Sequence, residues 1–132
     1  MTQRSLARVF LGLPGLFILF TGLVFLTQPE AALAKLQLSA HGAEGLSNMR
    51  GLGGAPLVAV GASLLMSAVT ANLTYARPGA IFLLVLLAAR LLSHVLDGAS
   101  GSLALFLTLP SVTFALMMVG HRLLDRSAAE PT

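Results

Sequence analysis

Three ionisable side chains stand at helical spacing inside an otherwise apolar stretch of the chain. Arg90, His94 and Asp97 follow one another at intervals of four and three residues in the run that begins at Ile81. Offsets of i, i+4 and i+7 place side chains on one face of an α-helix. A charged side chain within a membrane span costs about 2.5–3.5 kcal/mol on insertion scales, so it needs a compensating partner or role. This face is therefore the first place to look for a functional site.

Two further charges are candidate partners for this face. Glu44 lies in the first outer loop, and Arg50 ends this loop at the start of the second span. We expect both to lie on the same side of the membrane as Asp97. We predict one outer-leaflet polar cluster made of Glu44, Arg50, Arg90, His94 and Asp97. The favoured interpretation is a paired network that fixes helix register, since buried charges are normally paired. A pocket for a lipid, a quinone or another anionic group is the second interpretation, and a proton or ion path is the third.

Other kinds of site find little support in the residue pattern. The chain has no cysteine, which excludes disulfides, thiolate zinc sites and cysteine nucleophiles. His41, His94 and His121 lack the spacing of metal ligands. Ser93 is adjacent to His94, so the two side chains diverge on a helix and favour no catalytic triad. We predict no metal, no cofactor and no catalytic residues, and we favour a protein that is not an enzyme.

The composition indicates that this chain lies in a lipid bilayer. Of its 132 residues, 56% are hydrophobic and 10% are charged, and the mean hydropathy is +0.88. Soluble domains carry about 25% charged residues. The formal net charge of +3 does not gather in a basic patch with aromatics, so no nucleic acid is expected as a partner. We expect an integral membrane protein.

Four stretches have the length and apolar character of a membrane span, which takes about 20 residues. We expect one integral membrane domain over 1–132, with an all-α fold and a bundle of four transmembrane helices. Pro14 and Pro110 fall inside the first and last stretches and predict kinks there. The Gly- and Ser-rich run at 98–102 predicts the turn between the last two spans. The four spans are expected at 9–27, 51–72, 78–96 and 103–120.

The arginines and lysine predict the orientation, because cytoplasmic flanks carry an excess of them. With the amino terminus inside, the outer loops hold only Lys35 and Arg50, and both termini are cytoplasmic in a bacterial inner membrane. The inner flanks then hold Arg4, Arg8, Arg77, Arg122 and Arg126. A cleavable secretory signal ending near Ala34 is the alternative for the first thirty residues, although its apolar run is longer than the usual 7–15.

The loop at 28–50 is the only sizeable part that we expect outside the membrane. Pro29 and Glu30 precede good helix formers, which is typical of a helix start. The apolar residues that follow predict a short helix over 29–38 that lies at the outer membrane interface. This loop is too small to hold a catalytic domain of its own.

Small residues recur at every fourth position of the second span. They let helix backbones approach closely, which is how membrane helices gain packing contacts. We expect them to pack within the bundle, against at least two neighbours because the row drifts around the helix. A face for a homo-oligomer or a larger membrane complex is the alternative. The predicted packing residues are Gly51, Gly54, Ala55, Ala59, Ser63, Ser67 and Ala71.

Two short motifs resemble those of a known family. The run Asn48-Met-Arg50-Gly-Leu-Gly53-Gly54, followed by Leu57 and Gly61, is one of them, and Ala89-Arg90-Leu-Leu with Asp97-Gly98 is the other. Together they are similar to a family of small bacterial four-helix membrane proteins that is described only as a domain of unknown function. The resemblance implies a four-helix bundle, supplies no activity, and implies that Arg50, Gly54, Arg90 and Asp97 act together. Members often have an acidic residue close to that first arginine, whereas Asn48 stands there in this chain.

These observations lead to three hypotheses about function. The first is a non-enzymatic accessory or scaffold component whose polar cluster stabilises the bundle. The second is a lipid- or quinone-binding protein, in which apolar walls hold the tail of the ligand. The third is a small membrane enzyme or transporter, for which His94 and Asp97 offer a weak acid–base pair.

Overall fold

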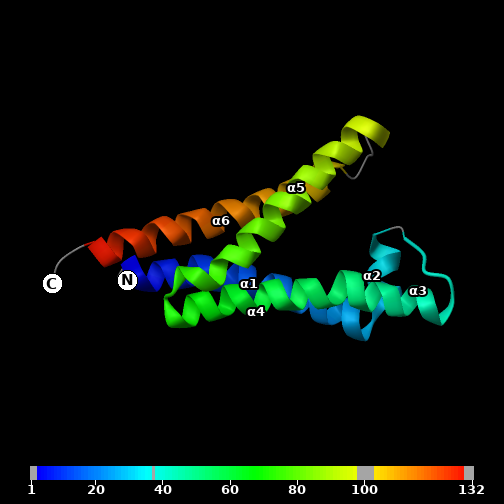
Figure 1. The fold of residues 1–132 in the computed structure, drawn as a ribbon, viewed down its shortest axis with the longest axis horizontal. Helices are drawn as coiled ribbons and strands as arrows, with labels where there is room; N and C mark the ends of the chain where they lie inside the picture. The colour runs from blue at the N-terminus through cyan, green and yellow to red at the C-terminus, as the bar shows by residue number, and fades with distance from the viewer. Residues whose placement is uncertain (1–2, 37, 98–102, 130–132) are drawn as a thin grey trace.

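The structure, a computed structural model, describes residues 3–36, 38–97 and 103–129. All regular elements in this part of the chain are helical, which confirms the predicted all-α class (Figure 1). In order along the chain they are α1 (Gln3–Thr27), α2 (Pro29–Lys35), α3 (Gly42–Asn48), the π-helix η1 (Met49–Gly54), α4 (Ala55–Thr70), the 3-10 helix η2 (Leu73–Ala76), α5 (Arg77–Asp97) and α6 (Leu103–Ala129).

The first, third and fourth predicted spans lie within observed helices, whereas the second extends two residues beyond its helical run, which ends at Thr70. The first span begins six residues earlier than expected, and the second continues backwards through η1 and α3 to Gly42. Three helical segments are long and apolar enough to cross a membrane, by length and composition: Ser5–Thr27, Gly42–Thr70 and Leu73–Ser93. The fourth expected span lies in α6, which continues through Pro110 and ends at Ala129.

The long helices run side by side with alternating direction. α1 packs mainly on α4 and also on α6, and α5 packs on α6 and on the end of α4. Figure 1 shows the C-terminal half of α5 leaning away from α1 and α4. α1 begins and α6 ends at one end of the bundle, which also holds η2, while α2 and α3 cover the other end. We refer to the end with α2 and α3 as the mouth end.

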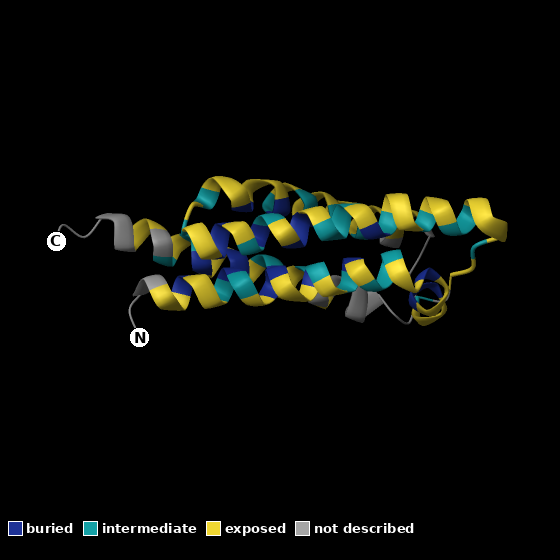
Figure 2. Ribbon diagram, turned by 90° about the horizontal axis from the view of Figure 1, so that it is seen from below, coloured by how far each residue is buried: buried dark blue, intermediate teal, exposed yellow. Residues whose placement is uncertain are grey.

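A narrow apolar core runs along the inner sides of these helices. Leu11 and Leu64 are fully buried at its centre, and seven further apolar residues surround them: Ala7, Ile18, Val60, Ala68, Ala76, Leu83 and Met117. The outward sides remain apolar as well, for example Phe20 with 65% and Val95 with 78% of its surface exposed. Figure 2 shows this division into inward buried and outward exposed positions. Outer faces with so much exposed apolar area suit contact with hydrocarbon.

Glycine brings the backbones of α1 and α4 into direct contact. A Cβ atom added at Gly61 would lie 2.6 Å from Leu19 Cα, and one added at Gly22 would lie 2.6 Å from Val58 N. These neighbours are backbone atoms, which a side-chain rotation cannot move. Only glycine therefore permits this approach, which we refer to as the α1–α4 seam.

The predicted row of small residues enters the bundle only in its second half. Ser67 is buried, and Ser63 and Ala71 are half-buried, whereas the first three members of the row are exposed: Gly51, Ala55 and Ala59. The row steps by four residues on a helix of 3.6 residues per turn, so each step rotates it by about 40°. Gly54, the predicted packing residue that is not part of this row, is buried against Leu26 at the end of α1.

The turn after α4 is stabilised by side chains of its own. Ala71 adopts a left-handed conformation (φ 53°) and ends the helix. The buried Ser67 hydroxyl donates to the carbonyl oxygen of Asn72 at 3.0 Å, and Asn72 Oδ1 accepts from the Thr74 amide at 3.0 Å. These two bonds satisfy polar groups at a helix end, where the backbone lacks partners of its own.

Candidate functional site

Arg50 closes the C-terminal end of α1. Its Nε donates to the carbonyl oxygen of Leu26 at 3.1 Å, across 24 positions of sequence. The last carbonyls of an α-helix have no partner within the helix, and a cation near them is favourable. Arg50 therefore links η1 to the end of α1.

The backbone around Arg50 is a π-helix rather than an α-helix. η1 covers Met49–Gly54, and a Cβ atom at Gly54 would lie 2.9 Å from Leu26 Cγ and 3.1 Å from Leu26 N. The glycine thus lets η1 approach the end of α1 closely. Short π segments inside longer helices occur frequently at functional sites.

A cavity of about 370 Å³ opens beside Arg50 at the mouth end. We refer to it as the mouth pocket. A cation and an anion line it together, Arg50 from η1 and Glu30 from α2. Its other lining residues are Thr27, Gln28, Pro29, Ala31 and Leu46.

α2 holds Glu30 in place through its buried side. Pro29 stands at the start of the helix, and Pro29, Ala32 and Leu33 are its buried residues. Glu30 itself is exposed and lies in the first turn, where an acidic side chain is favourable. A short helix thus forms where the sequence predicted one, although it ends at Lys35 rather than at 38.

The five residues of the predicted polar cluster come from three elements, α3, η1 and α5. Glu44 is exposed on α3 and Arg50 is exposed on η1, both at the mouth end. Arg90 is half-buried on α5, whose C-terminal half leans away from α3 and η1 (Figure 1). The side chains of His94 and Asp97 lie outside the described part of the structure. The joining of all five in one cluster stays a prediction.

Glu30 is the mouth-pocket residue that the sequence did not single out as part of a site. The sequence marked it only as part of a helix start. Arg50, which lines the same pocket, lies 20 positions later, and η1 and α2 both contact α1. The one signal in the sequence is that both charges flank the same outer loop.

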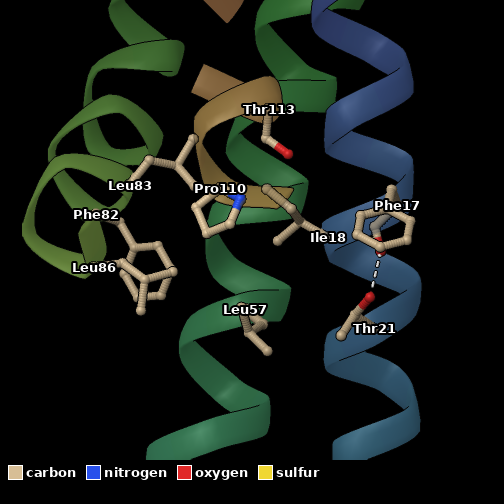
Figure 3. Close-up of a pocket in the computed structure, with 9 residues that line it drawn as sticks. All are labelled: Phe17, Ile18, Thr21, Leu57, Phe82, Leu83, Leu86, Pro110 and Thr113. Atoms are coloured by element: carbon tan, nitrogen blue, oxygen red, sulfur yellow. Dashed lines mark hydrogen bonds between the residues drawn. The ribbon is translucent and has the colours of Figure 1, made fainter. Parts of the chain in front are cut away.

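A second cavity, of about 110 Å³, lies between the four long helices (Figure 3). We refer to it as the bundle cavity. Its walls carry no charged side chain, and the Thr21 hydroxyl is bonded to the Phe17 carbonyl oxygen of its own helix at 2.9 Å. It is lined by Phe17, Ile18 and Thr21 of α1, Leu57 of α4, Phe82, Leu83 and Leu86 of α5, and Pro110 and Thr113 of α6. Such walls suit an apolar group.

A further pair of ionisable residues lies at the opposite end from the mouth pocket. His121 Nδ1 is 3.0 Å from Asp125 Oδ2, one turn apart on α6, and both side chains are about half exposed (45% and 59%). Exposed pairs of this kind contribute about 0–1 kcal/mol. We assign this pair to the helix surface.

Together, the fold and its cavities define a class: an α-helical bundle whose helices include three that are long and apolar enough to span a membrane. Within that class, residues 6–121 match a family model described as a domain of unknown function, DUF4345. The chain belongs to this family, which confirms the family resemblance read from its two short motifs. No curated protein and no solved structure matches the chain.

Proposed function

We propose that the chain is a four-span protein of the bacterial inner membrane that acts as a non-enzymatic accessory component. The observation that carries the proposal is the contrast between the two sides of each helix. The inner sides approach through glycine at Gly22 and Gly61, while the outer sides expose large apolar residues. Close packing of small residues with apolar outer faces is how helices associate in lipid.

The fourth span of this proposal is α6. Its 27 residues exceed the ~20 that a spanning helix requires. It packs along α1 and α5, which are themselves long enough to span. Leu11 of α1 and Met117 of α6 are both buried in the core. A helix that packs in this way among spanning helices is itself surrounded by the bilayer.

Charge at the two ends supports a cytoplasmic location of both termini. Arg8 near the start of α1, Arg77 at the start of α5, and Arg122 and Arg126 near the end of α6 all belong to the end opposite the mouth. The mouth end carries Lys35 and Arg50. An excess of arginine on one side marks that side as cytoplasmic.

Cysteine labelling tests the four-span topology directly, because the natural chain has no cysteine. Single substitutions Ser47→Cys, Thr74→Cys and Ser127→Cys are expressed in cells and exposed to a membrane-impermeant maleimide. We expect Ser47→Cys to react in intact cells and the other two only after permeabilisation. Reaction of Thr74→Cys in intact cells would refute the orientation, and opposite sidedness of Thr74→Cys and Ser127→Cys would refute the number of spans.

The accessory role is tested by the assembly state of the chain in its own membrane. A tagged full-length chain, expressed at its native level and solubilised in mild detergent, should migrate with a partner protein in fixed stoichiometry. A chain that elutes as a monomer both before and after cross-linking in the membrane would contradict the accessory role. The cysteine labelling is independent of that result.

The bundle cavity favours a second function, the binding of an apolar chain such as that of a lipid or quinone. An engineered cavity of about 150 Å³ with similar aliphatic and aromatic walls binds benzene in another protein, and the present cavity has about 110 Å³. Leu86→Trp, which fills the cavity, should abolish co-purification of the apolar ligand in native mass spectrometry. Leu84→Trp, on the exposed side of the same helix, is the control. Equal ligand retention in both variants would argue against this function.

A further inference from the structure

We propose that the mouth pocket binds the head group of an aminophospholipid, a phosphate diester that carries a primary ammonium group. Arg50 takes the phosphate and Glu30 takes the ammonium. The proposal rests on the membrane location proposed above, since it needs the mouth pocket to lie at the level of the lipid head groups. It names a ligand class and a site that the accessory role does not require.

Arg50 is positioned before any ligand arrives. Its Nε–H is used by the Leu26 carbonyl oxygen at 3.1 Å, which fixes the plane of the guanidinium at the wall of the pocket. A guanidinium has five N–H donors, and this bond uses one of them. The planar fork of donors matches the oxygens of a phosphate group. Arg50 therefore offers an oriented phosphate contact rather than a mobile surface charge.

Glu30 supplies the opposite charge on the same cavity. Among the residues that the structure describes, Glu30 and Arg50 line one pocket without forming an ion pair with each other. An ionised carboxylate only accepts hydrogen bonds, so it pairs with an ammonium that has N–H donors. A purely anionic head group would bind Arg50, but its own negative charge would then repel the carboxylate of Glu30. A ligand that carries both charges satisfies both residues.

The size and place of the pocket fit a head group. Its volume of about 370 Å³ lies within the range of about 300–1,000 Å³ that is usual for small-molecule sites. It is built where α1 ends at Thr27 and where the helical run that begins at Gly42 enters the bundle. In a spanning protein these helix ends lie at the polar boundary of the bilayer. The uncharged lining residues Thr27 and Gln28 bring further polar groups to the pocket.

Native mass spectrometry of the full chain from vesicles of defined composition tests the site. The vesicles hold equal amounts of phosphatidylethanolamine, phosphatidylglycerol and phosphatidylcholine. We expect the wild type to retain about ten times more phosphatidylethanolamine than either other lipid. A tenfold difference is about what the loss of one charge-assisted hydrogen bond, here the one to Glu30, would cause. Phosphatidylcholine keeps its positive charge but has no N–H donor for Glu30. Equal retention of the three lipids by the wild type would overturn the proposal.

The two charged residues should fail in different ways. Glu30→Gln should lose the preference for phosphatidylethanolamine but keep phospholipid, whereas Arg50→Gln should lose bound phospholipid of every kind. Arg50→Lys keeps a phosphate-binding charge and is the variant to use if Arg50→Gln does not fold. Matched controls are Lys35→Gln at the mouth end, outside the pocket lining, and Arg77→Gln at the opposite end, and both should behave as the wild type. An unchanged lipid profile in Glu30→Gln would also overturn the proposal.

A water-soluble competitor distinguishes a site for a membrane lipid from a site for a soluble phosphate ester with the same head group. Glycerophosphoethanolamine is the same phosphate diester with the same ammonium group and no acyl chains. If the site serves a membrane lipid, an excess of glycerophosphoethanolamine should leave the bound lipid in place; displacement of the lipid by that excess would overturn the assignment to a lipid. The cysteine labelling keeps this proposal separate from the proposed function. Correct labelling with no head-group preference refutes the site alone.

Discussion

Replacing Gly61 by alanine should destabilise the protein, because it adds one carbon atom to the tightest point of the α1–α4 seam. The new Cβ would lie 2.6 Å from Leu19 Cα, with the amide nitrogen of Leu19 closer still. Carbon atoms prefer a separation of about 3.5–4.0 Å, so the two helices must move apart by roughly 1 Å. A gap of about 0.5–1 Å already forfeits a quarter to a half of the dispersion energy of each contact across it.

The size of the effect follows from two opposing terms. Overpacking of this kind costs about 1–3 kcal/mol. Alanine recovers about 0.5–1 kcal/mol over glycine inside a helix. The net expectation for Gly61→Ala is a loss of about 0–2.5 kcal/mol in the free energy of unfolding relative to the wild type, and of about 1–3 kcal/mol relative to a glycine-to-alanine control without the clash. Gly61→Val should cost more, since its branched side chain meets the same backbone.

Unfolding in mixed micelles, followed by circular dichroism while the fraction of SDS is raised, measures this change. Gly51→Ala is the matched control, because a Cβ at Gly51 meets nothing within 4 Å. Gly12→Ala is a second control on α1, where the added Cβ lies 3.6 Å from Ala68 Cβ, an ordinary contact. Both controls should be as stable as the wild type or slightly more stable. If Gly61→Ala unfolds together with the controls, the seam does not hold α1 and α4 together.

Three other substitutions probe contacts of different kinds, all read out in the same unfolding assay. Gly120→Ala should cost less than Gly61→Ala, because its added Cβ meets the side-chain atom Leu11 Cγ at 2.9 Å and has its nearest backbone neighbour, the Ala7 carbonyl oxygen, at 3.3 Å; an equal or larger cost would contradict this ranking. Ser67→Ala should cost about 0.5–1.5 kcal/mol, the usual net contribution of one hydrogen bond, because it removes the bond to the Asn72 carbonyl oxygen, whereas Ser63→Ala, which loses only a bond to its own helix, should stay near the wild type. Arg50→Gln should lose about 0.3–1 kcal/mol, the usual contribution of a cation at a helix C-terminus, and no loss would mean that its bond to Leu26 is not formed in the membrane.

The helices were predictable from the sequence because they follow from hydropathy and from local stop signals. α1 ends at Thr27, the residue at which we expected the first span to end, next to Gln28 and Pro29, and a short helix starts at Pro29. Pro78 correctly predicted the start of α5 within one residue. These features depend on residues close together in the chain, so no knowledge of the tertiary packing is needed.

The packing was predicted less completely, because it depends on helix phase. Small residues at Gly51, Ala55 and Ala59 look equivalent to Ser67 in the sequence, but a row stepping by four rotates by about 200° over its five intervals. Its two ends cannot face the same neighbour. Within α4, the glycine that meets α1 is Gly61, which lies outside the row and which the sequence named only within the family motif.

The candidate site was predictable only in part, because its charges come from elements far apart in the chain. Arg50 belonged to the predicted cluster, and the structure gives it a bond to Leu26 and a place in the mouth pocket. Glu30 and Arg50 line the same pocket, and both α2 and η1 contact α1. η1 is a π-helix, which the spacing of apolar residues does not predict.

The α1–α4 seam extends to the mouth pocket, so the two features share the same contacting helices. Lipid supplies no hydrophobic drive between helices, so close approach must hold α1 to α4. The line of glycine contacts on these helices, Gly61 at Leu19, Gly22 at Val58 and Gly54 at Leu26, runs toward the mouth end. There Arg50 bonds to the same Leu26 that Gly54 contacts. A binding group mounted on rigid elements keeps its geometry without help from a ligand, so loosening the seam at Gly61 should weaken head-group binding at Arg50 as well.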